Sequence, residues 1–178
     1  MNRIGQFFKV SFDQYCAARE AEGKFGCVET YEKIPLPSRA TTGSAGYDFK
    51  APFGFTLLPG ESIKIPTGIR VKIAEGWMLA CFPRSGLGFK YRVQLDNTVG
   101  IIDSDYFNSD NEGHIFAKLT NDSKEGKPVT IKRGEAFMQG VFIPYGITYD
   151  DAASGVRNGG LGSTSIPNII EFAQKQVA

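Results

Sequence analysis

The feature of this sequence that most constrains its fold is a period-two alternation of apolar and polar residues. In segments 62–65 and 69–73, isoleucine and valine alternate with serine, lysine and arginine on either side of a Pro-Thr-Gly turn. The alternation returns at 115–119, and further apolar runs lie at 77–82, 129–132 and 136–145. Because successive side chains of a strand point to opposite faces, this pattern is typical of half-buried strands. Short strands separated by turns predict an all-β sandwich or barrel.

The composition fits a single globular domain. The chain has 178 residues, of which 42% are apolar, enough to bury a core of its own. Lys and Arg number 20 against 19 Asp and Glu, so no basic field favours direct binding of nucleic acid. No apolar run approaches the ~20 residues of a membrane-spanning helix. We therefore expect neither a nucleic acid nor a membrane as a direct partner.

The cysteine and histidine content argues against disulfides and against a protein-built metal centre. Cys16, Cys27 and Cys81 are odd in number and lack C-x-x-C spacing, which predicts no disulfide framework and no zinc site. The N-terminus lacks the apolar core of a secretion signal, so we expect a cytoplasmic protein with reduced thiols. His114 is the single histidine, and we interpret it as structural or surface-lying rather than catalytic.

The first 33 residues differ from the strand-rich middle of the chain. The segment 7–10 favours a short strand, and Ser11 with Gln14 three residues later forms a capping box. An alanine- and glutamate-containing stretch over 12–22 then predicts a helix that Gly23 ends. We treat residues 1–33 as an N-terminal extension.

The C-terminal part has the opposite character. Periodic strands stop near Tyr145, and a polar, Gly-rich stretch runs on to residue 165. The last piece, 169–177, favours a short amphipathic helix. The predicted organisation is a β domain over 34–165, with a flexible C-terminal arm from about 146, and a tail over 166–178.

Two polar segments near the middle of the chain suit an anion. Asp48 lies between aromatics at a strand start, where it either caps a turn or takes part in a site. Arg84, Ser85 and Gly86 follow an apolar strand, and a helix beginning there would aim backbone N–H groups and a guanidinium at a phosphate. The alternative for this second segment is a plain strand-to-helix loop.

The densest polar segment is 97–106, which reads N-T-V-G-I-I-D-S-D-Y. Asp103 and Asp105 stand two residues apart in an otherwise apolar hairpin, so they share a face unless the chain turns between them. A carboxylate beside apolar side chains is a plausible general base, because desolvation raises its proton affinity. A turn rich in Asp and Ser is the alternative.

Two further segments lie later in the chain. Gln139 sits within an apolar strand, where its amide either satisfies backbone groups or reaches a ligand. The stretch 157–164 combines Arg157 with glycines and hydroxyls, and it either wraps an anion or is an exposed tail.

Taken in order, these segments resemble the five motifs of the trimeric dUTPase family. The matching runs are A-G-Y-D, P-R-S-G-L-G, N-T-V-G-I-I-D-S-D-Y, R-G-E-A-x-x-Q and R-x-G-G-L-G-S-T. The resemblance covers about Ile34 to Ser165 and includes the phrases L-P-G-E and I-P-T-G-I. It implies a β jelly roll assembled as a homotrimer, in which each active site draws on all three chains.

The resemblance also implies an activity. Members of this family hydrolyse dUTP to dUMP and pyrophosphate with Mg²⁺ as cofactor, which keeps uracil out of DNA and supplies dUMP for thymidylate synthesis. By similarity, Asp103 is the base that deprotonates the attacking water, and Tyr106 stacks under the deoxyribose and excludes a 2′-hydroxyl. The uracil is expected to be read by Asn97, Gly100, Ile101, Ile102 and Phe116.

The phosphate and metal contacts are implied by the other motifs. Arg84, Ser85, Gly86 and Gln139 match phosphate-binding positions, and Asp48 is expected near the water shell of the magnesium. The arm residues that match the motif closing over the γ-phosphate are Arg157, Gly162, Ser163 and Thr164.

Three departures from the family pattern bear on the site. Leu161 replaces the usual aromatic of the arm, and a single residue, Asn158, separates Arg157 from the glycine pair. The segment 107–111 is an insertion in the third motif. We hypothesise that Phe107 of this insertion is the lid aromatic in place of Leu161; the alternative is that its ring packs into the trimer or the N-terminal helix.

Two other functions stay open at the level of sequence. One is a dCTP deaminase or a bifunctional relative, which the intact third motif with Tyr106 disfavours. The other is a trimeric regulatory binding protein, for which the N-terminal helix and the insertion offer surfaces toward an unknown protein partner.

Overall fold

The computed structural model describes residues 2–23 and 26–159. The elements, in chain order, are β1 (Gly5–Lys9), α1 (Phe12–Ala21), α2 (Cys27–Glu32), β2 (Tyr47–Lys50), β3 (Phe55–Leu57), β4 (Ser62–Pro66), β5 (Ile69–Ile73), β6 (Trp77–Pro83), α3 (Ser85–Tyr91), β7 (Val93–Leu95), β8 (Gly100–Ile102), the 3₁₀ turn η1 (Ser104–Asn108), β9 (Phe116–Asn121), β10 (Val129–Ile131) and β11 (Ala136–Pro144). The strands predicted from period-two alternation are β4, β5 and β9, and all three are present.

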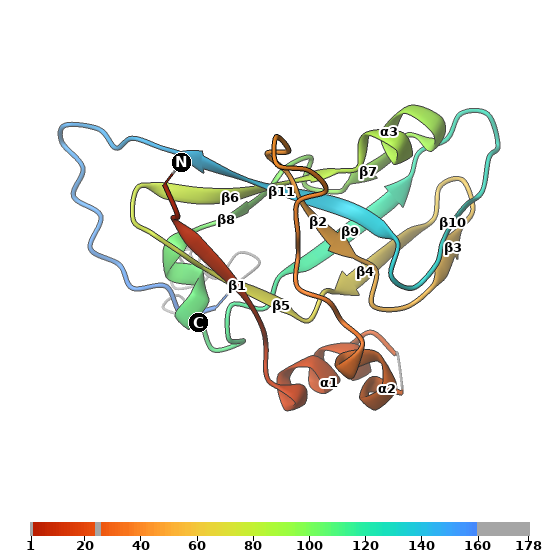
Figure 1. Cartoon of the computed structure of the whole chain (residues 1–178), viewed down its shortest axis with the longest axis horizontal. Helices are drawn as coiled ribbons and strands as arrows, with labels where there is room; N and C mark the ends of the chain where they lie inside the picture. The colour runs from red at the N-terminus through yellow and green to blue at the C-terminus, as the bar shows by residue number, and fades with distance from the viewer. Residues whose placement is uncertain (1, 24–25, 160–178) are drawn as a thin grey trace, which may run out of the picture.

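The strands form antiparallel sheets around one core (Figure 1). A four-stranded sheet has the order β2-β11-β6-β8, and a three-stranded sheet has the order β4-β9-β7. Phe49 and Phe137 from the first sheet and Leu119 from the second are at most 1% exposed and belong to one cluster of buried side chains. The predicted all-β architecture is therefore confirmed. No helix among the described residues is long and apolar enough to span a membrane.

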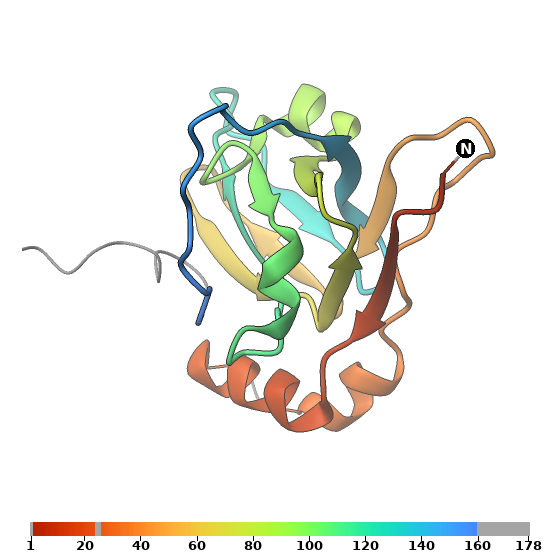
Figure 2. The same cartoon turned by 90° about the vertical axis from the view of Figure 1, so that its left-hand side faces the viewer.

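The N-terminal extension packs on this core instead of trailing from it. Strand β1 pairs with β5 from Gly5↔Ile73 to Lys9↔Ile69. Helices α1 and α2 lie together below the sheets in Figures 1 and 2. Tyr15 of α1 is completely buried. Ser11 caps α1 as predicted, its Oγ accepting a hydrogen bond from the backbone N–H of Gln14 at 3.1 Å.

Two features of the extension were not predicted. Helix α2 is one, and a disulfide between Cys16 of α1 and Cys27 of α2 is the other, with their Cα atoms 5.4 Å apart. The expectation of no disulfide was wrong, because spacing along the sequence does not show that two short helices fold back on each other. Cys81 is left as a buried free thiol, and burial raises its pKa to about 12.

The C-terminal arm begins where β11 ends. Residues 145–156 are all exposed. The arm then runs back along the edge of the molecule to η1, as both Figures 1 and 2 show. The predicted helix over 169–177 lies outside the described residues.

Candidate functional site

The first group of predicted site residues meets where β2, β11 and the end of β6 lie side by side, and we call it the Asp48 cluster: Asp48 of β2, Gln139 of β11 and Arg84 after β6. The register pairs Gln139 directly with Asp48. Nη1 of Arg84 forms an ion pair with Oδ1 of Asp48, and Nε2 of Gln139 donates to the carbonyl of Pro83 at 3.4 Å. The cluster therefore joins motifs that are far apart in sequence.

The first motif lies close against the amide of Gln139. A Cβ at Gly46 would lie 2.5 Å from its Oε1, so a side chain at position 46 would displace this amide. Ser85 and Gly86 begin α3 beside this cluster and are exposed. Asp48, by contrast, has a side chain only 12% exposed. The cluster presents one guanidinium, one amide and a shielded carboxylate to the surface.

The second group is the Asp103 hairpin, which we define as residues 97–106. Strand β8 pairs with β6, and Asp103 stands at the N-cap of η1 immediately after β8. Thr98 has a φ of 61° in the tip of the hairpin. A Cβ at Gly100 would lie 3.3 Å from Cβ of Cys81, so β8 sits close against β6. The chain turns after Asp103, so Asp103 and Asp105 do not lie on a single straight strand.

Tyr106 is held firmly beside this acid. Its hydroxyl donates to the carbonyl of His114 and accepts from Nδ2 of Asn111, both at 2.8 Å. Its ring is 8% exposed. Burial, partly offset by the Asn111 hydrogen bond and the charge of Arg157, raises the pKa of Tyr106. The phenol is therefore protonated at neutral pH and acts as a fixed wall.

The remaining predicted hairpin residues surround the same region. Ile101 is 48% exposed, whereas Ile102 is half-buried. The N–H of Asp96 donates to the carbonyl of Lys118, which places Asn97 beside the first residues of β9, where Phe116 lies. Asn97 thus neighbours β9, while Ile101 and Ile102 lie on β8.

His114 is structural, as interpreted from the sequence. It is fully buried, and its Nε2 accepts a hydrogen bond from the N–H of Gly68 at 2.9 Å. Its ring lies 4.5 Å from that of Phe116. Burial, opposed only weakly by the charge of Glu112, lowers the pKa of His114 to about 4.

The C-terminal arm reaches the hairpin through Arg157. Its Nη2 donates to Oδ2 of Asp103 at 2.5 Å, and its Nε donates to Oδ1 of Asp105 at 2.9 Å. Oγ of Ser109 donates to the carbonyl of Gly159 at 3.3 Å. The predicted arm residues Leu161, Gly162, Ser163 and Thr164 lie outside the described residues. The sequence predicted that Arg157 binds a phosphate, whereas in the structure its guanidinium binds the carboxylates of Asp103 and Asp105.

Phe107 has partners within its own chain. The guanidinium carbon of Arg70 lies 3.7 Å from the centre of its ring, and the ring of Phe8 lies 5.7 Å away. These contacts favour the packing alternative, although the partner is the strand β1 rather than the N-terminal helix. The lid role stays a prediction.

The two groups lie apart in a single chain. Ile102 pairs with Leu79 on β6, and the antiparallel register therefore places Asp103 near Met78. Met78 lies six residues before Arg84 along the chain. At ~3.3 Å per residue, the strand separates the two groups by ~20 Å. Figure 1 shows α3 at the upper right and the green turn η1 on the left side of the molecule, below β8. One chain does not bring Asp103 and Arg84 together.

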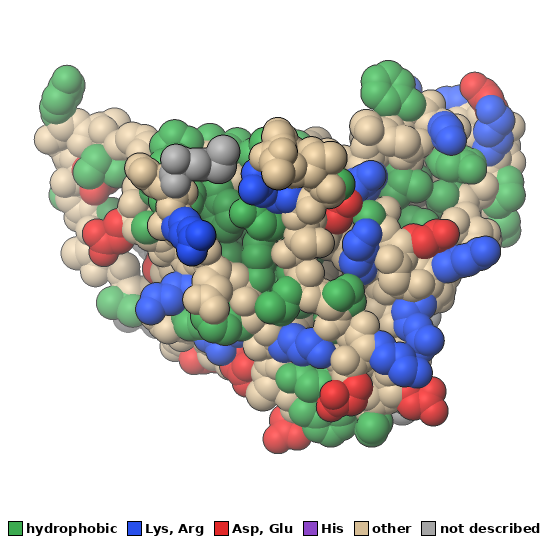
Figure 3. Space-filling model, viewed as in Figure 1, with side chains coloured by type: hydrophobic (Ala, Val, Ile, Leu, Met, Phe, Trp, Pro, Cys, Tyr) green, Lys and Arg blue, Asp and Glu red, His purple; other side chains and the backbone are tan. Residues whose placement is uncertain are grey.

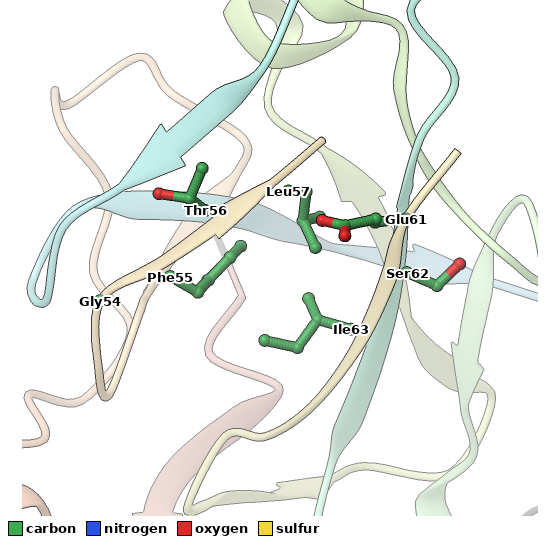
Figure 4. Close-up of a pocket in the computed structure, with 7 residues that line it drawn as sticks. All are labelled: Gly54, Phe55, Thr56, Leu57, Glu61, Ser62 and Ile63. Atoms are coloured by element: carbon green, nitrogen blue, oxygen red, sulfur yellow. The ribbon is translucent and has the colours of Figure 1, made fainter. Parts of the chain in front are cut away.

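Neither of two hollows on the described surface is the predicted site. Figure 4 shows one between β3 and β4, lined by residues 54–57 and 61–63. Its carboxylate, Glu61, accepts the N–H of Leu58 at 2.7 Å and so caps a turn. The other lies beneath the 39–45 loop, where Figure 3 shows apolar side chains flanked by basic ones. It adjoins the first motif but contains none of Asp48, Arg84 and Asp103.

Comparison with known proteins identifies close relatives. The family model described as dUTPase matches residues 32–165. Deoxyuridine 5′-triphosphate nucleotidohydrolase of Lactococcus lactis is 41% identical over 134 residues, covering 74% of this chain and 88% of that protein. The enzyme of the same name from Actinobacillus pleuropneumoniae is 41% identical over 138 residues, covering 73% and 87%.

Solved structures agree with this result. The crystal structure of dUTPase from Streptococcus mutans has a TM-score of 0.56 at 38% identity, covering 64% of this chain and 88% of that one. A dUTPase from phage phi11 of Staphylococcus aureus, described with a structural Mg(II) ion, has a TM-score of 0.61 at 19% identity, covering 86% and 98%. The predicted jelly-roll type of fold is confirmed.

Proposed function

The chain belongs to the dUTPase family, and from that premise we propose that it hydrolyses dUTP to dUMP and pyrophosphate. The observation that carries the proposal is the Asp103 hairpin. It sets a half-exposed carboxylate three residues before a buried tyrosine whose hydroxyl is fixed by two hydrogen bonds. A carboxylate near a rigid aromatic ring can activate a water molecule, which then attacks the phosphate of a nucleotide whose sugar rests on that ring.

The chemical step is proton abstraction followed by phosphorus–oxygen bond cleavage. Asp103 takes a proton from a water molecule, whose oxygen forms a bond to the α-phosphorus. The bond from that phosphorus to the oxygen bridging toward the β-phosphate breaks, and pyrophosphate leaves with the bonding electrons. Tyr106 carries the deoxyribose and leaves no room for a 2′-hydroxyl. The backbone at 100–102, with Asn97 and Phe116, reads the uracil edge.

The phosphates require concentrated positive charge, because the chain as a whole is nearly neutral. Arg84, with the backbone at Ser85 and Gly86 and the amide of Gln139, supplies donors at the Asp48 cluster. Arg157, with Gly162, Ser163 and Thr164, supplies donors from the arm. Arg157 has to leave Asp103 to do so, because its Nη2 and Nε donate to Asp103 and Asp105 and the same donors cannot also bind a phosphate. Substrate binding therefore frees the base.

The side chains present fit magnesium that is held mainly by the substrate. Among the described residues, no three His, Cys, Asp or Glu side chains gather into a metal-binding cluster. Asp48 supplies a carboxylate oxygen, which is the ligand type that Mg²⁺ prefers, and its place beside Arg84 puts it near the phosphates. When bound, the ion neutralises charge that develops on the phosphate oxygens. Removing it with EDTA is expected to abolish turnover.

We propose a site shared between the chains of a homotrimer, which the separation of the two groups supports. Because ~20 Å of β6 lies between Asp103 and Arg84, one triphosphate is bound by the hairpin of one chain and the Asp48 cluster of another. Mixing two inactive variants tests this arrangement. Asp103→Asn and Arg84→Gln, refolded together, are expected to regain activity, because some sites combine two intact halves. If each chain forms its own site, the mixture stays inactive.

The activity itself is tested with four nucleotides. The chain is incubated with Mg²⁺ and dUTP, dCTP, UTP or dTTP, and pyrophosphate and ammonia are measured. We expect pyrophosphate mainly from dUTP, with UTP hydrolysed far less efficiently. Ammonia from dCTP would instead identify a deaminase.

Two matched variants separate the base from its neighbour. Asp103→Asn is expected to lower kcat by ~10²–10⁴-fold, because an amide positions water but accepts no proton. Asp105→Asn removes the other carboxylate that binds Arg157 and serves as the control, with a far smaller loss expected. Equal losses for the two variants, or near-wild-type turnover by folded Asp103→Asn, would contradict the role of Asp103.

A further inference from the structure

The segment between Tyr106 and His114 connects the proposed sugar site to the N-terminal extension. The family pattern does not account for this extension, and the insertion 107–111 lies within the connecting segment. A role for this segment in placing Tyr106 against a sugar rests on the proposed function, in which Tyr106 carries the deoxyribose.

The first connection is a carboxylate that binds the start of α1. The backbone N–H of Ser11 donates to Oε2 of Glu112 at 2.7 Å, and Oγ of Ser11 donates to Oε1 at 2.6 Å. Burial acts to raise the pKa of the Glu112 carboxyl, but the two Ser11 hydrogen bonds and the charge of Arg70 outweigh it, and the pKa lies below its usual value. Glu112 is therefore ionised at neutral pH and binds both donors through charge-assisted hydrogen bonds.

The backbone of Glu112 shows that this contact is not incidental. Its φ is 58°, in the left-handed region that residues other than glycine and asparagine rarely adopt. Such a conformation persists where surrounding contacts hold it. The bidentate contact with Ser11 is a contact of that kind.

The second connection runs through Arg70 of β5. Strand pairing sets Phe8 of β1 opposite Arg70, and the rings of Phe8 and Phe107 lie 5.7 Å apart. Nη2 of Arg70 donates to the carbonyl of Phe107 at 2.5 Å, while its guanidinium lies over the Phe107 ring. Nη1 of Arg70 lies 3.7 Å from the Glu112 carboxylate. Arg70 therefore joins both connections.

The segment itself is too tightly folded to absorb a displacement. A Cβ at Gly113 would lie 2.7 Å from the carbonyl oxygen of Tyr106 and 2.8 Å from Cα of Phe107. Its two ends thus touch, and Asn111 and the His114 carbonyl hold the Tyr106 hydroxyl from within. Because packed atoms transmit strain rather than yielding, a shift at 107 or 112 also shifts the tyrosine.

We propose that Arg70 and Glu112 are positioning residues, through which the N-terminal extension sets the place of Tyr106 and with it the discrimination between deoxyribose and ribose. The extension is in this sense a part of the sugar site, and this role requires no contact between its residues and the sugar. Loosening either connection lets the tyrosine recede and admits a 2′-hydroxyl.

The experiment measures kcat and KM for dUTP and UTP in full-length variants. Ser11→Ala removes one donor, Glu112→Gln removes the charge, and Arg70→Lys removes the stacking plane. Each is expected to lower the ratio of kcat/KM for dUTP to that for UTP by about tenfold, because each loses a charge-assisted contact that holds the segment in place. Ser11→Thr keeps the hydroxyl and should restore the ratio.

A matched control and a double variant sharpen the result. Glu61→Gln alters a glutamate that likewise accepts a backbone N–H at 2.7 Å, but in the turn before β4, and is expected to leave the ratio unchanged. Ser11→Ala combined with Glu112→Gln should lower the dUTP-to-UTP ratio little more than either substitution alone, because both weaken the same contact between Ser11 and Glu112. A lowered melting temperature with an unchanged ratio in all three variants would overturn the proposal and leave the extension purely structural.

Failure of the proposed function gives a different result. If wild-type protein hydrolyses no dUTP, calorimetric titration with the non-hydrolysable α,β-imido analogues of dUTP and UTP replaces kinetics. If the wild-type protein binds the deoxy analogue more tightly and the variants lose part of this preference, the positioning role is supported even without turnover. Equal affinity for both analogues in the wild-type protein overturns it.

Discussion

The two ends of the chain reach the surroundings of Tyr106 by different means. The N-terminal extension binds the segment that follows the Asp103 hairpin, through Ser11 and Glu112, whereas the C-terminal arm binds the hairpin itself through Arg157. Behind the extension stand a paired strand, a completely buried Tyr15 and a disulfide. Behind the arm lie twelve consecutive exposed residues, 145–156.

This difference separates a permanent contact from an exchangeable one. Releasing the extension from the core would expose buried apolar surface at ~25 cal/mol per Å². Releasing Arg157 breaks an ion pair with two carboxylates that are 42% and 54% exposed, and such pairs are screened by salt and worth little. The arm is therefore suited to exchange a carboxylate for a phosphate, while the extension is suited to hold position.

The largest expected effect comes from deleting the arm. Removal of residues 157–178 should lower kcat/KM for dUTP by ~10²-fold or more, because it removes charge-stabilising donors at the phosphates. The melting temperature should stay within a few degrees of the wild-type value, since the core strands end at Pro144. Deletion of residues 1–33 provides the contrast and should prevent folding. A truncated arm variant that unfolds, or that hydrolyses dUTP normally, would remove the distinction between the two ends.

The second effect is acid destabilisation through His114, whose ring lies 6.4 Å from that of Tyr15 in the extension. Its folded pKa of about 4 lies below the usual 6.5, so the unfolded chain binds a proton first as the pH falls. Above pH ~6.5 the histidine has no differential effect, and between pH 6.5 and 4 folding weakens by up to about 3 kcal/mol. Thermal melts across this range measure the loss.

His114→Gln is the control for this pH dependence. The glutamine oxygen replaces Nε2 as the acceptor for Gly68, but it does not titrate. The variant should therefore show a flat melting temperature between pH 6.5 and 4.5. Below about pH 4.5 the variant should begin to lose stability, because the pKa of folded Glu112 is lowered and the unfolded chain therefore takes up a proton first. An unchanged slope in the variant would assign the acid effect to other groups.

The third effect concerns the disulfide that makes the extension rigid. Cys16 and Cys27 close a loop with a sequence separation of 11, and its reduction should lower stability by about 2–3 kcal/mol. Dithiothreitol should lower the melting temperature of the wild-type protein but not that of the Cys16→Ser/Cys27→Ser variant. Titration of the denatured, unreduced protein should find one thiol, that of Cys81. Three thiols before reduction would refute the pairing.

The smallest effect distinguishes the two interpretations of Phe107. Because its ring packs on Arg70 and Phe8, Phe107→Ala should cost about 1 kcal/mol of stability from the lost cation–π and ring contacts. If the ring were instead the lid over uracil, KM for dUTP would rise about tenfold with no change in melting temperature. Leu161→Ala, in the arm, should change KM less. Melting curves and kinetics of both variants decide between the two.

The sequence predicted those parts of the molecule that depend on local rules. Alternation along 62–65, 69–73 and 115–119 predicted β4, β5 and the start of β9, because the side-chain period of a strand is visible in one dimension. Ser11 and Gln14 predicted the N-cap of α1, since a cap involves residues three apart. The five ordered motifs predicted the family, because each motif is a continuous run.

Only the tertiary structure decided which of these residues meet. It paired Cys16 with Cys27, Ser11 with Glu112 and Arg157 with Asp103. No rule based on sequence spacing predicts contacts between residues separated in this way. It also set Asp48 opposite Gln139 while leaving Asp103 at the far end of β6. The physical reason is that local propensity fixes where a strand or helix begins, whereas the register of sheets and the packing of helices fix which distant side chains become neighbours.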